Sequence, residues 1–228
     1  MKIVGLAGQS GTGKSTIAAH LAMRGGAHID ADLIAHELLD HDASVGTEIR
    51  RRFGETVFGA DGRIDRRRLG GIVFGDAREL RALNAIVHPA VKRVCVERIE
   101  HLRGRRKPVP FVVIDAALLL EVEMPFEFDL VIALRCRPEE QFRRLAAKSG
   151  CSEKEIRARL ESQQRMGDWF DKADVIIDTD RPLLDVLAEV DAQVDRLMGG
   201  ERRERDEKGR GEERPSRRRG APEEEKNK

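Results

Sequence analysis

Five short apolar runs, spread widely along the chain, have the length and composition of buried β-strands. Each run contains few polar positions, which is typical of parallel strands that are covered on both faces. Several of the segments between them place apolar side chains three and four positions apart, the spacing of amphipathic helices. We therefore predict an α/β fold in which a parallel sheet is flanked by helices. The predicted strands are Ile3–Ala7, Ala27–Asp30, Phe111–Asp115, Leu130–Leu134 and Ala173–Asp178.

The same spacing predicts where the helices begin and end. The longest predicted helix contains His88 followed by Pro89. A proline inside a run of good helix formers predicts a break or a kink at that point. The predicted helices are Thr16–Met23, Leu33–Leu39, Asp65–Phe74, Ala77–Leu102, Pro138–Lys148, Glu153–Gln164 and Leu183–Met198.

The first predicted strand leads into Gly8–Ser15, which matches the phosphate-binding loop pattern G-x-x-x-x-G-K-[ST] at every fixed position. Because a strand precedes it and a helix follows, we interpret it as a nucleotide site rather than an accidental glycine-rich turn. Lys14 would contact the β- and γ-phosphates of ATP, and the Ser15 hydroxyl would ligate Mg²⁺. The fold class is therefore a three-layer P-loop NTPase core. The predicted nucleotide-binding residues are Gly11, Thr12, Gly13, Lys14, Ser15 and Thr16.

Carboxylates follow two other predicted strands, at the sheet edge where ligands of parallel sheets bind. Of Asp30 and Asp32, one could cap the next helix while the other serves the site, and we favour Asp32 for the site. Asp32 could act as general base toward an acceptor hydroxyl or hold a Mg²⁺-bound water. Asp115 ends its strand as a Walker-B aspartate does, which makes it a second candidate Mg²⁺ ligand, although strands also end in Asp at turns.

Two stretches of mainly polar helices are inserted between the predicted strands. Residues 40–106 are predicted to form a helical acceptor-binding region. Residues 138–165 carry Arg144 and Lys148 one turn apart on the same helix face. They predict a lid that closes over phosphates, although an exposed helical hairpin would show the same charges. The core then comprises residues 1–39, 107–137 and 166–198.

Composition narrows the possible partners. The 228 residues include 42 Lys and Arg and 41 Asp and Glu, for a net charge of +1, so no nucleic-acid partner is expected. Residues 199–228 mix blocks of both signs and predict a disordered charged tail, either a solvated end or a weak electrostatic tether. Cys95, Cys136 and Cys151 show no metal-site spacing and predict reduced thiols in a cytoplasmic protein. No apolar run reaches the ~18 residues that span a bilayer, so no membrane partner is expected.

In the order and spacing of its motifs, the chain resembles dephospho-CoA kinase over about residues 1–198. The most specific matching segments are Ile29–Asp32 and Leu83–Pro89, because many NTPases share the phosphate loop. The other matching positions are Phe53-Gly54, Ala60-Asp61-Gly62, Leu118-Leu119 with Glu121, Arg144, Arg159 with Gln163, and Ala173–Asp178.

The resemblance implies phosphorylation of the ribose 3′-hydroxyl of dephospho-CoA by ATP, the last step of coenzyme A biosynthesis. ATP and Mg²⁺ would be required, and the protein would be a monomer or a weak homo-oligomer. By position, Asp32, Lys14 and Arg144 would be catalytic. His88 and Pro89 would shape the acceptor site, and Lys148 would contact substrate phosphates from the lid.

Three positions depart from the family pattern. Ala117 stands in place of a proline, Lys148 in place of a lid arginine, and Thr179 in place of the asparagine after the last strand. Lysine keeps the charge but lacks the planar fork that grips a phosphate in two places. Two alternative functions are therefore kept: a nucleoside or nucleotide kinase of the same fold, and an ATP-binding regulatory module without efficient transfer.

Overall fold

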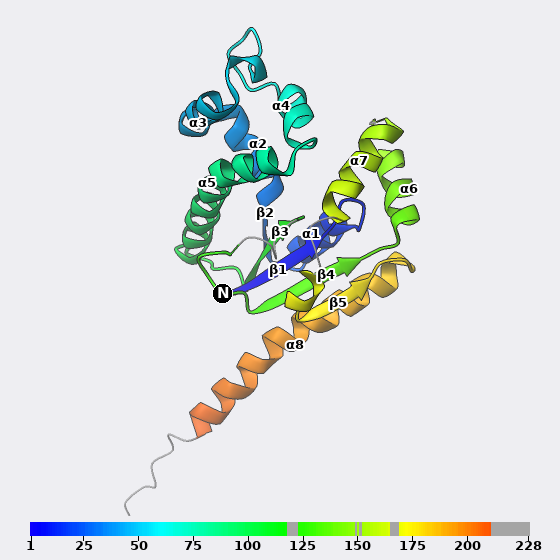
Figure 1. Cartoon of the computed structure of the whole chain (residues 1–228). Helices are drawn as coiled ribbons and strands as arrows, with labels where there is room; N and C mark the ends of the chain where they lie inside the picture. The colour runs from blue at the N-terminus through cyan, green and yellow to red at the C-terminus, as the bar shows by residue number, and fades with distance from the viewer. Residues whose placement is uncertain (118–122, 149, 151, 165–168, 211–228) are drawn as a thin grey trace, which may run out of the picture. The chain divides into compact units, whose positions relative to one another are not determined.

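The computed structural model describes residues 1–117, 123–148, 150, 152–164 and 169–210, and a five-stranded parallel sheet lies at its centre. The strand order is β2-β3-β1-β4-β5 (Figure 1). All five predicted strands are present, and β1 occupies the middle, so the phosphate loop leaves the centre of the sheet. The strands are β1 (Lys2–Gly8), β2 (Ala27–Asp30), β3 (Phe111–Ala116), β4 (Leu130–Arg135) and β5 (Val175–Asp178).

Helices fill each connection of the sheet except that between β3 and β4, part of which lies outside the described residues. Figure 1 shows α2 to α5, which connect β2 to β3, as one group, and α6 with α7, which connect β4 to β5, as another. The helices are α1 (Lys14–Met23), α2 (Ala31–His41), α3 (Ala43–Phe53), α4 (Arg66–Val73), α5 (Ala77–Arg103), α6 (Pro138–Lys148), α7 (Glu153–Gln164) and α8 (Leu183–Arg210), with 3₁₀ turns at Glu55–Val57 and Trp169–Lys172.

The two faces of the sheet bury different side chains, because successive residues of a strand point to opposite faces. Ile3 and Ala7 of β1 belong to a buried cluster that also contains residues of α2 to α5. Val4 and Leu6 alternate with them and are also buried. The opposite face is covered by α1, which buries Ile17.

An aspartate caps each of the helices α2 to α5. In every case the carboxylate accepts a hydrogen bond from a main-chain N–H group of the first helical turn. This contact satisfies donors that a helix leaves unpaired and explains why these helices begin where they do. The capping residues are Asp30, Asp42, Asp65 and Asp76.

The sequence predicted a break or a kink at His88-Pro89, and the break is absent, because α5 is one continuous helix with Pro89 inside it. Proline removes only one hydrogen bond from the helix ladder. Buried residues lie on both sides of it, among them Val87, Ala90 and Cys95, so packing against the neighbouring helices offsets the lost bond.

Helix α8 extends to Arg210, whereas the sequence predicted its end at Met198 and a disordered tail from residue 199. The stretch from Glu201 to Lys208 consists of Glu, Arg, Asp and Lys, most of which are good helix formers. The remainder of the predicted tail lies outside the described residues. The chain divides into two compact units, Met1–Asp191 and Ala192–Lys228.

Cys95 and Cys136 are buried free thiols, as predicted, while Cys151 lies outside the described residues. Among the described residues, no helix combines the length and the apolar character needed to cross a membrane.

Candidate active site

The phosphate loop has a main-chain geometry that glycine favours. Gly8, Gly11 and Gly13 all have positive φ, at 154°, 84° and 98°. Thr12 is fully buried, and its hydroxyl donates to the Gln9 carbonyl (2.8 Å), so its side chain shapes the loop. No side chain caps α1, and no acidic residue lies in its first turn. The helix therefore presents its N-terminal N–H groups to an anion.

A cavity of about 690 Å³ opens at this loop. It brings together residues from the loop, from the ends of β2, β3 and β5, and from the helices α6 and α7. Lys14 lies within it, and its ammonium group donates to the Gly8 carbonyl at 2.6 Å. The predicted site residues that line the cavity are Gly11, Thr12, Gly13, Lys14, Ser15, Thr16, Asp32, Asp115 and Arg144.

The two aspartates at the end of β2 and the start of α2 differ in their contacts. Asp30 caps α2 by accepting the Leu33 N–H (2.8 Å), while Asp32 lines the cavity one residue into that helix. The Ala117 N–H donates to both oxygens of Asp32, at 3.1 and 3.4 Å. Burial raises the pKa of Asp32, and the charge of Lys14 and the Ala117 N–H partly oppose that rise. Asp32 is therefore a desolvated carboxylate held beside a lysine, suited to accept a proton.

Asp115 of β3 is almost fully buried, with 4% of its side chain exposed. Its Oδ1 has no hydrogen-bond partner among the described residues, and its Oδ2 lies 3.6 Å from Nε2 of His28. It shares the cavity with Asp30 and Asp32. Three carboxylates, of Asp30, Asp32 and Asp115, therefore line the cavity together with Lys14.

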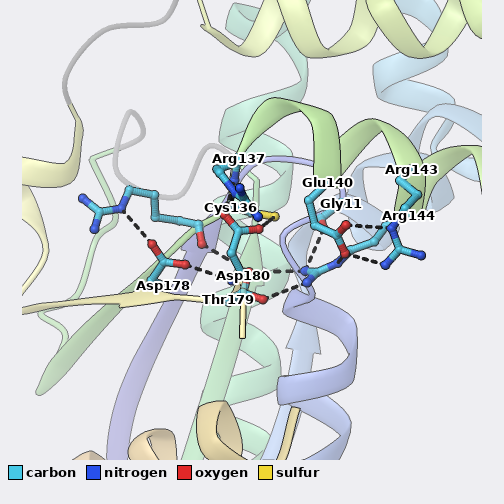
Figure 2. A network of polar contacts seen from close by, with 10 residues as sticks. Gly11, Cys136, Arg137, Glu140, Arg143, Arg144, Asp178, Thr179 and Asp180 are labelled. Carbon is cyan, nitrogen blue, oxygen red and sulfur yellow. Dashed lines mark hydrogen bonds and ion pairs between the residues drawn. The ribbon is translucent and has the colours of Figure 1, made fainter. Parts of the chain in front are cut away.

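Arg144 joins α6 to both the phosphate loop and the end of β5, as Figure 2 shows. Its guanidinium donates to Glu140 (2.8 Å), to the Gly11 carbonyl (3.4 Å), and to the hydroxyl and carbonyl of Thr179 (3.3 and 2.7 Å). Hydrogen bonds from Arg143 and then Arg144 lower the pKa of Glu140 to about 2. Arg144 is consequently fixed in place over the loop.

Thr179, one of the departures from the family pattern, has a clear structural role. It is buried, and its hydroxyl donates to the Arg135 carbonyl (3.2 Å) while accepting from Arg144. This side chain therefore supports Arg144 and ties it to the last two strands.

Helices α6 and α7 also contact the loop through two glutamines that sequence reasoning did not assign to the site. Gln163 accepts the Ser10 N–H (2.9 Å) and donates to the Ser10 hydroxyl (3.2 Å). Gln141 donates to the side chain of Gln9 (3.1 Å). The signal available in the sequence was the match of Gln163, with Arg159, to the family pattern. Arg159 also lines the cavity.

The structure does not bring every predicted residue to the cavity. His88 and Pro89 are absent from its lining among the described residues, and they lie inside α5. Burial, and then the charge of Lys92, lower the pKa of His88, which favours the neutral form of the side chain. The side chain of Lys148 lies outside the described residues, as do Leu118, Leu119 and Glu121.

The chain is similar to dephospho-CoA kinases over most of its length. The family model described as dephospho-CoA kinase matches residues 2–185. The dephospho-CoA kinase of Leifsonia xyli subsp. xyli is 40% identical over 192 residues, which cover 84% of this chain and 96% of the relative. That of Thermobifida fusca is 39% identical over 198 residues, covering 86% and 97%.

Solved structures agree with this likeness. TT1252 from Thermus thermophilus has a TM-score of 0.69 and 31% identity, covering 86% of this chain and 97% of that one. The dephospho-CoA kinase from Campylobacter jejuni has a TM-score of 0.59 and 25% identity, covering 88% and 100%. The chain therefore belongs to the dephospho-CoA kinase family.

Proposed function

We propose that the chain transfers the γ-phosphoryl group of ATP to the ribose 3′-hydroxyl of dephospho-CoA, giving coenzyme A and ADP. The observation that carries the proposal is the meeting of Lys14 and Asp32 in one cavity, in a chain of this family. A phosphate-binding cation and a desolvated carboxylate are the two groups that transfer to an alcohol requires.

On the nucleotide side, the loop residues Gly11 to Ser15 and the start of α1 would bind the phosphates. The Lys14 ammonium would exchange its contact with the Gly8 carbonyl for the β- and γ-phosphate oxygens. Arg144 would stabilise the negative charge on the transferred group from the opposite side. Its contacts to Glu140 and Thr179 would hold the guanidinium in place before the reaction. The side chain of Arg144 would then lose little conformational entropy during the reaction.

The cavity offers donors that fit Mg²⁺. The Ser15 hydroxyl and the carboxylates of Asp32 and Asp115 all line it, and Mg²⁺ prefers oxygen ligands. The buried Oδ1 of Asp115, which has no hydrogen-bond partner among the described residues, suits a bound cation or its water. When bound, Mg²⁺ would neutralise charge on the phosphates.

On the acceptor side, Asp32 would accept the proton of the ribose 3′-hydroxyl as its oxygen bonds to the γ-phosphorus. The bond from that phosphorus to the β–γ bridging oxygen breaks, and ADP leaves. The Ala117 N–H would keep the carboxylate aimed at the hydroxyl. Helices α2 to α5, including His88 and Pro89, would bind the rest of the acceptor, and α6 and α7 with Lys148 would form the lid.

The proposal is tested by measuring ADP release from Mg·ATP with and without dephospho-CoA, and by checking that the product gains the mass of one phosphate. We expect strong acceptor-dependent release, which Lys14→Ala abolishes without unfolding the protein. Adenosine and other nucleosides serve as competing acceptors. Turnover of a nucleoside instead of dephospho-CoA would indicate the nucleoside-kinase alternative, and ATP binding without any transfer would indicate a regulatory module.

A further inference from the structure

Two neighbouring strands place an imidazole and two carboxylates together beside the phosphate loop. Asp30 of β2 pairs with Asp115 of β3, so their side chains lie on the same face of the sheet. His28 is two residues before Asp30 and therefore lies on that face as well. One donor atom from each of the three side chains lies within 4.8 Å of the other two.

The spacing between His28 and Asp115 suits a metal ion better than a hydrogen bond. Nε2 of His28 and Oδ2 of Asp115 are 3.6 Å apart, which exceeds the length of a hydrogen bond between such groups. Two ligands bound to a tetrahedral Zn²⁺ at about 2.1 Å are separated by roughly 3.4 Å. A small dication would therefore fit between the two side chains with little movement.

The charge of Asp115 provides independent support. Its side chain is 4% exposed, and its Oδ1 has no hydrogen-bond partner among the described residues. Burying a carboxylate with so few compensating contacts is costly unless a cation is bound. The nearby lysine of the loop, Lys14, directs its ammonium to the Gly8 carbonyl at 2.6 Å. The hydrogen bond from the Leu33 N–H fixes the side chain of Asp30, and burial restricts that of Asp115. Two of the three ligand side chains are therefore already ordered.

We propose that His28, Asp30 and Asp115 bind a divalent metal ion in the absence of nucleotide, with Zn²⁺ as the best fit and water as its fourth ligand. The imidazole distinguishes the ligand set of this site from that of the nucleotide-bound ion, because Mg²⁺ prefers oxygen donors whereas imidazole suits Zn²⁺. The His28 side chain is 27% exposed, which leaves a path for the ion to enter. The site shares Asp115 with the proposed Mg²⁺ site, so the test is made without nucleotide and does not require the kinase reaction.

The test is Zn²⁺ binding to the full chain without nucleotide, measured by competition with a chromogenic chelator. Co²⁺ serves as a second probe, because a tetrahedral Co²⁺ complex absorbs visible light. We expect one site that His28→Gln weakens at least tenfold. His41→Gln, a matched change on α2, and Ser15→Ala, which alters the loop hydroxyl, should both retain full affinity.

Asp115→Asn separates a metal site from a purely structural ion pair. It removes the buried charge, so it should raise the melting temperature of the metal-free protein and abolish the further rise that Zn²⁺ gives the unmodified chain. Equal Zn²⁺ affinity in the unmodified chain and in His28→Gln would overturn the proposal. Absence of binding in the unmodified chain would overturn it too, whatever the kinase assay shows.

Discussion

Asp32 shows how one carboxylate can be prepared for chemistry by its surroundings. Burial raises its pKa, while Lys14 and the Ala117 N–H favour the ionised form. The departure at Ala117 contributes directly, because a proline at that position would have no N–H group to donate. The substitution therefore adds a hydrogen bond to the proposed base.

The role of Asp32 can be tested with Asp32→Asn. We expect turnover to fall by about 10²–10⁴-fold, since an amide cannot accept the proton, while ATP binding is unchanged. Steady-state kinetics and nucleotide titration give the two quantities. Asp61→Asn, at an exposed aspartate that does not line the cavity, is the control. Undiminished turnover of Asp32→Asn would rule out its catalytic role.

Single residues differ in how well the sequence predicts them. Lys14, Ser15 and Asp32 could be predicted because the chemistry of each follows from a local pattern. The roles of Thr179 and Gln163 could not be derived from local chemistry, since each acts through a contact with a residue far away in the chain. Glu140 pairs with Arg144 one turn along the same helix, but the contact of Arg144 with the loop is seen only in the fold. A pattern within one segment carries no information about such partners.

At the scale of elements, α6 and α7 are tied to the phosphate loop by side chains and by close packing. A Cβ added to Gly11 would lie 2.8 Å from the Gln141 carbonyl oxygen, so the loop touches the main chain of α6. Gln163 makes two hydrogen bonds from α7 to Ser10. The conformation of the loop is therefore coupled to the position of both helices.

Replacing Gln163 tests this coupling. Gln163→Leu keeps the size of the side chain and removes both hydrogen bonds, each of which contributes about 1 kcal/mol. We expect the dissociation constant for ATP to rise by about tenfold, measured by calorimetry. Glu153→Gln, on the exposed first turn of the same helix, should leave it unchanged. An unaltered dissociation constant for ATP in Gln163→Leu would show that α7 does not control the conformation of the phosphate loop.

The low pKa of Glu140 predicts that its contribution to the stability of the protein depends on pH. Its pKa lies at about 2 in the folded chain, below its ordinary value of 4.5, because Arg143 and Arg144 donate to it. Its contribution to stability is therefore complete above pH 4.5 and is lost as the pH falls toward 2. We expect Glu140→Gln to be less stable than the unmodified chain at pH 7 in urea unfolding, with the difference vanishing near pH 2. If the difference in stability between the two chains did not change with pH, ionisation of Glu140 could not be its cause.

Most elements were predicted with the right type, although α3 was not among the predicted helices, and the ends of elements were predicted less well. All five strands were found because continuous apolar runs are a local signal. The uninterrupted α5 was missed because tertiary packing around Pro89 overrides the local preference for a break. The N-caps of α3 and α5, Asp42 and Asp76, could be recognised only once the helices were seen.

At the scale of the whole molecule, every described residue that lines the cavity lies between Gln9 and Val186. All of them belong to the unit Met1–Asp191. The chain from Gly199 onward belongs to the other unit, Ala192–Lys228.

Removing Gly199–Lys228 should accordingly leave both turnover and the KM for each substrate within about twofold. The measurement is the coupled ADP assay on the shortened and full chains at low and high salt. A KM that rises on truncation, and only at low salt, would instead support an electrostatic tether for anionic substrates.

The order of the strands has a consequence for how the protein is made. The first strand pairs only with β3 and β4, so Lys2 meets Phe111 and Val4 meets Leu130. While the ribosome synthesises the chain, the phosphate loop emerges before β3 and β4, when no neighbouring strand yet exists to hold β1. A nascent chain therefore completes its nucleotide site only after β3 and β4 have been translated, and a message cut short before β4 yields a product whose first strand lacks a neighbour.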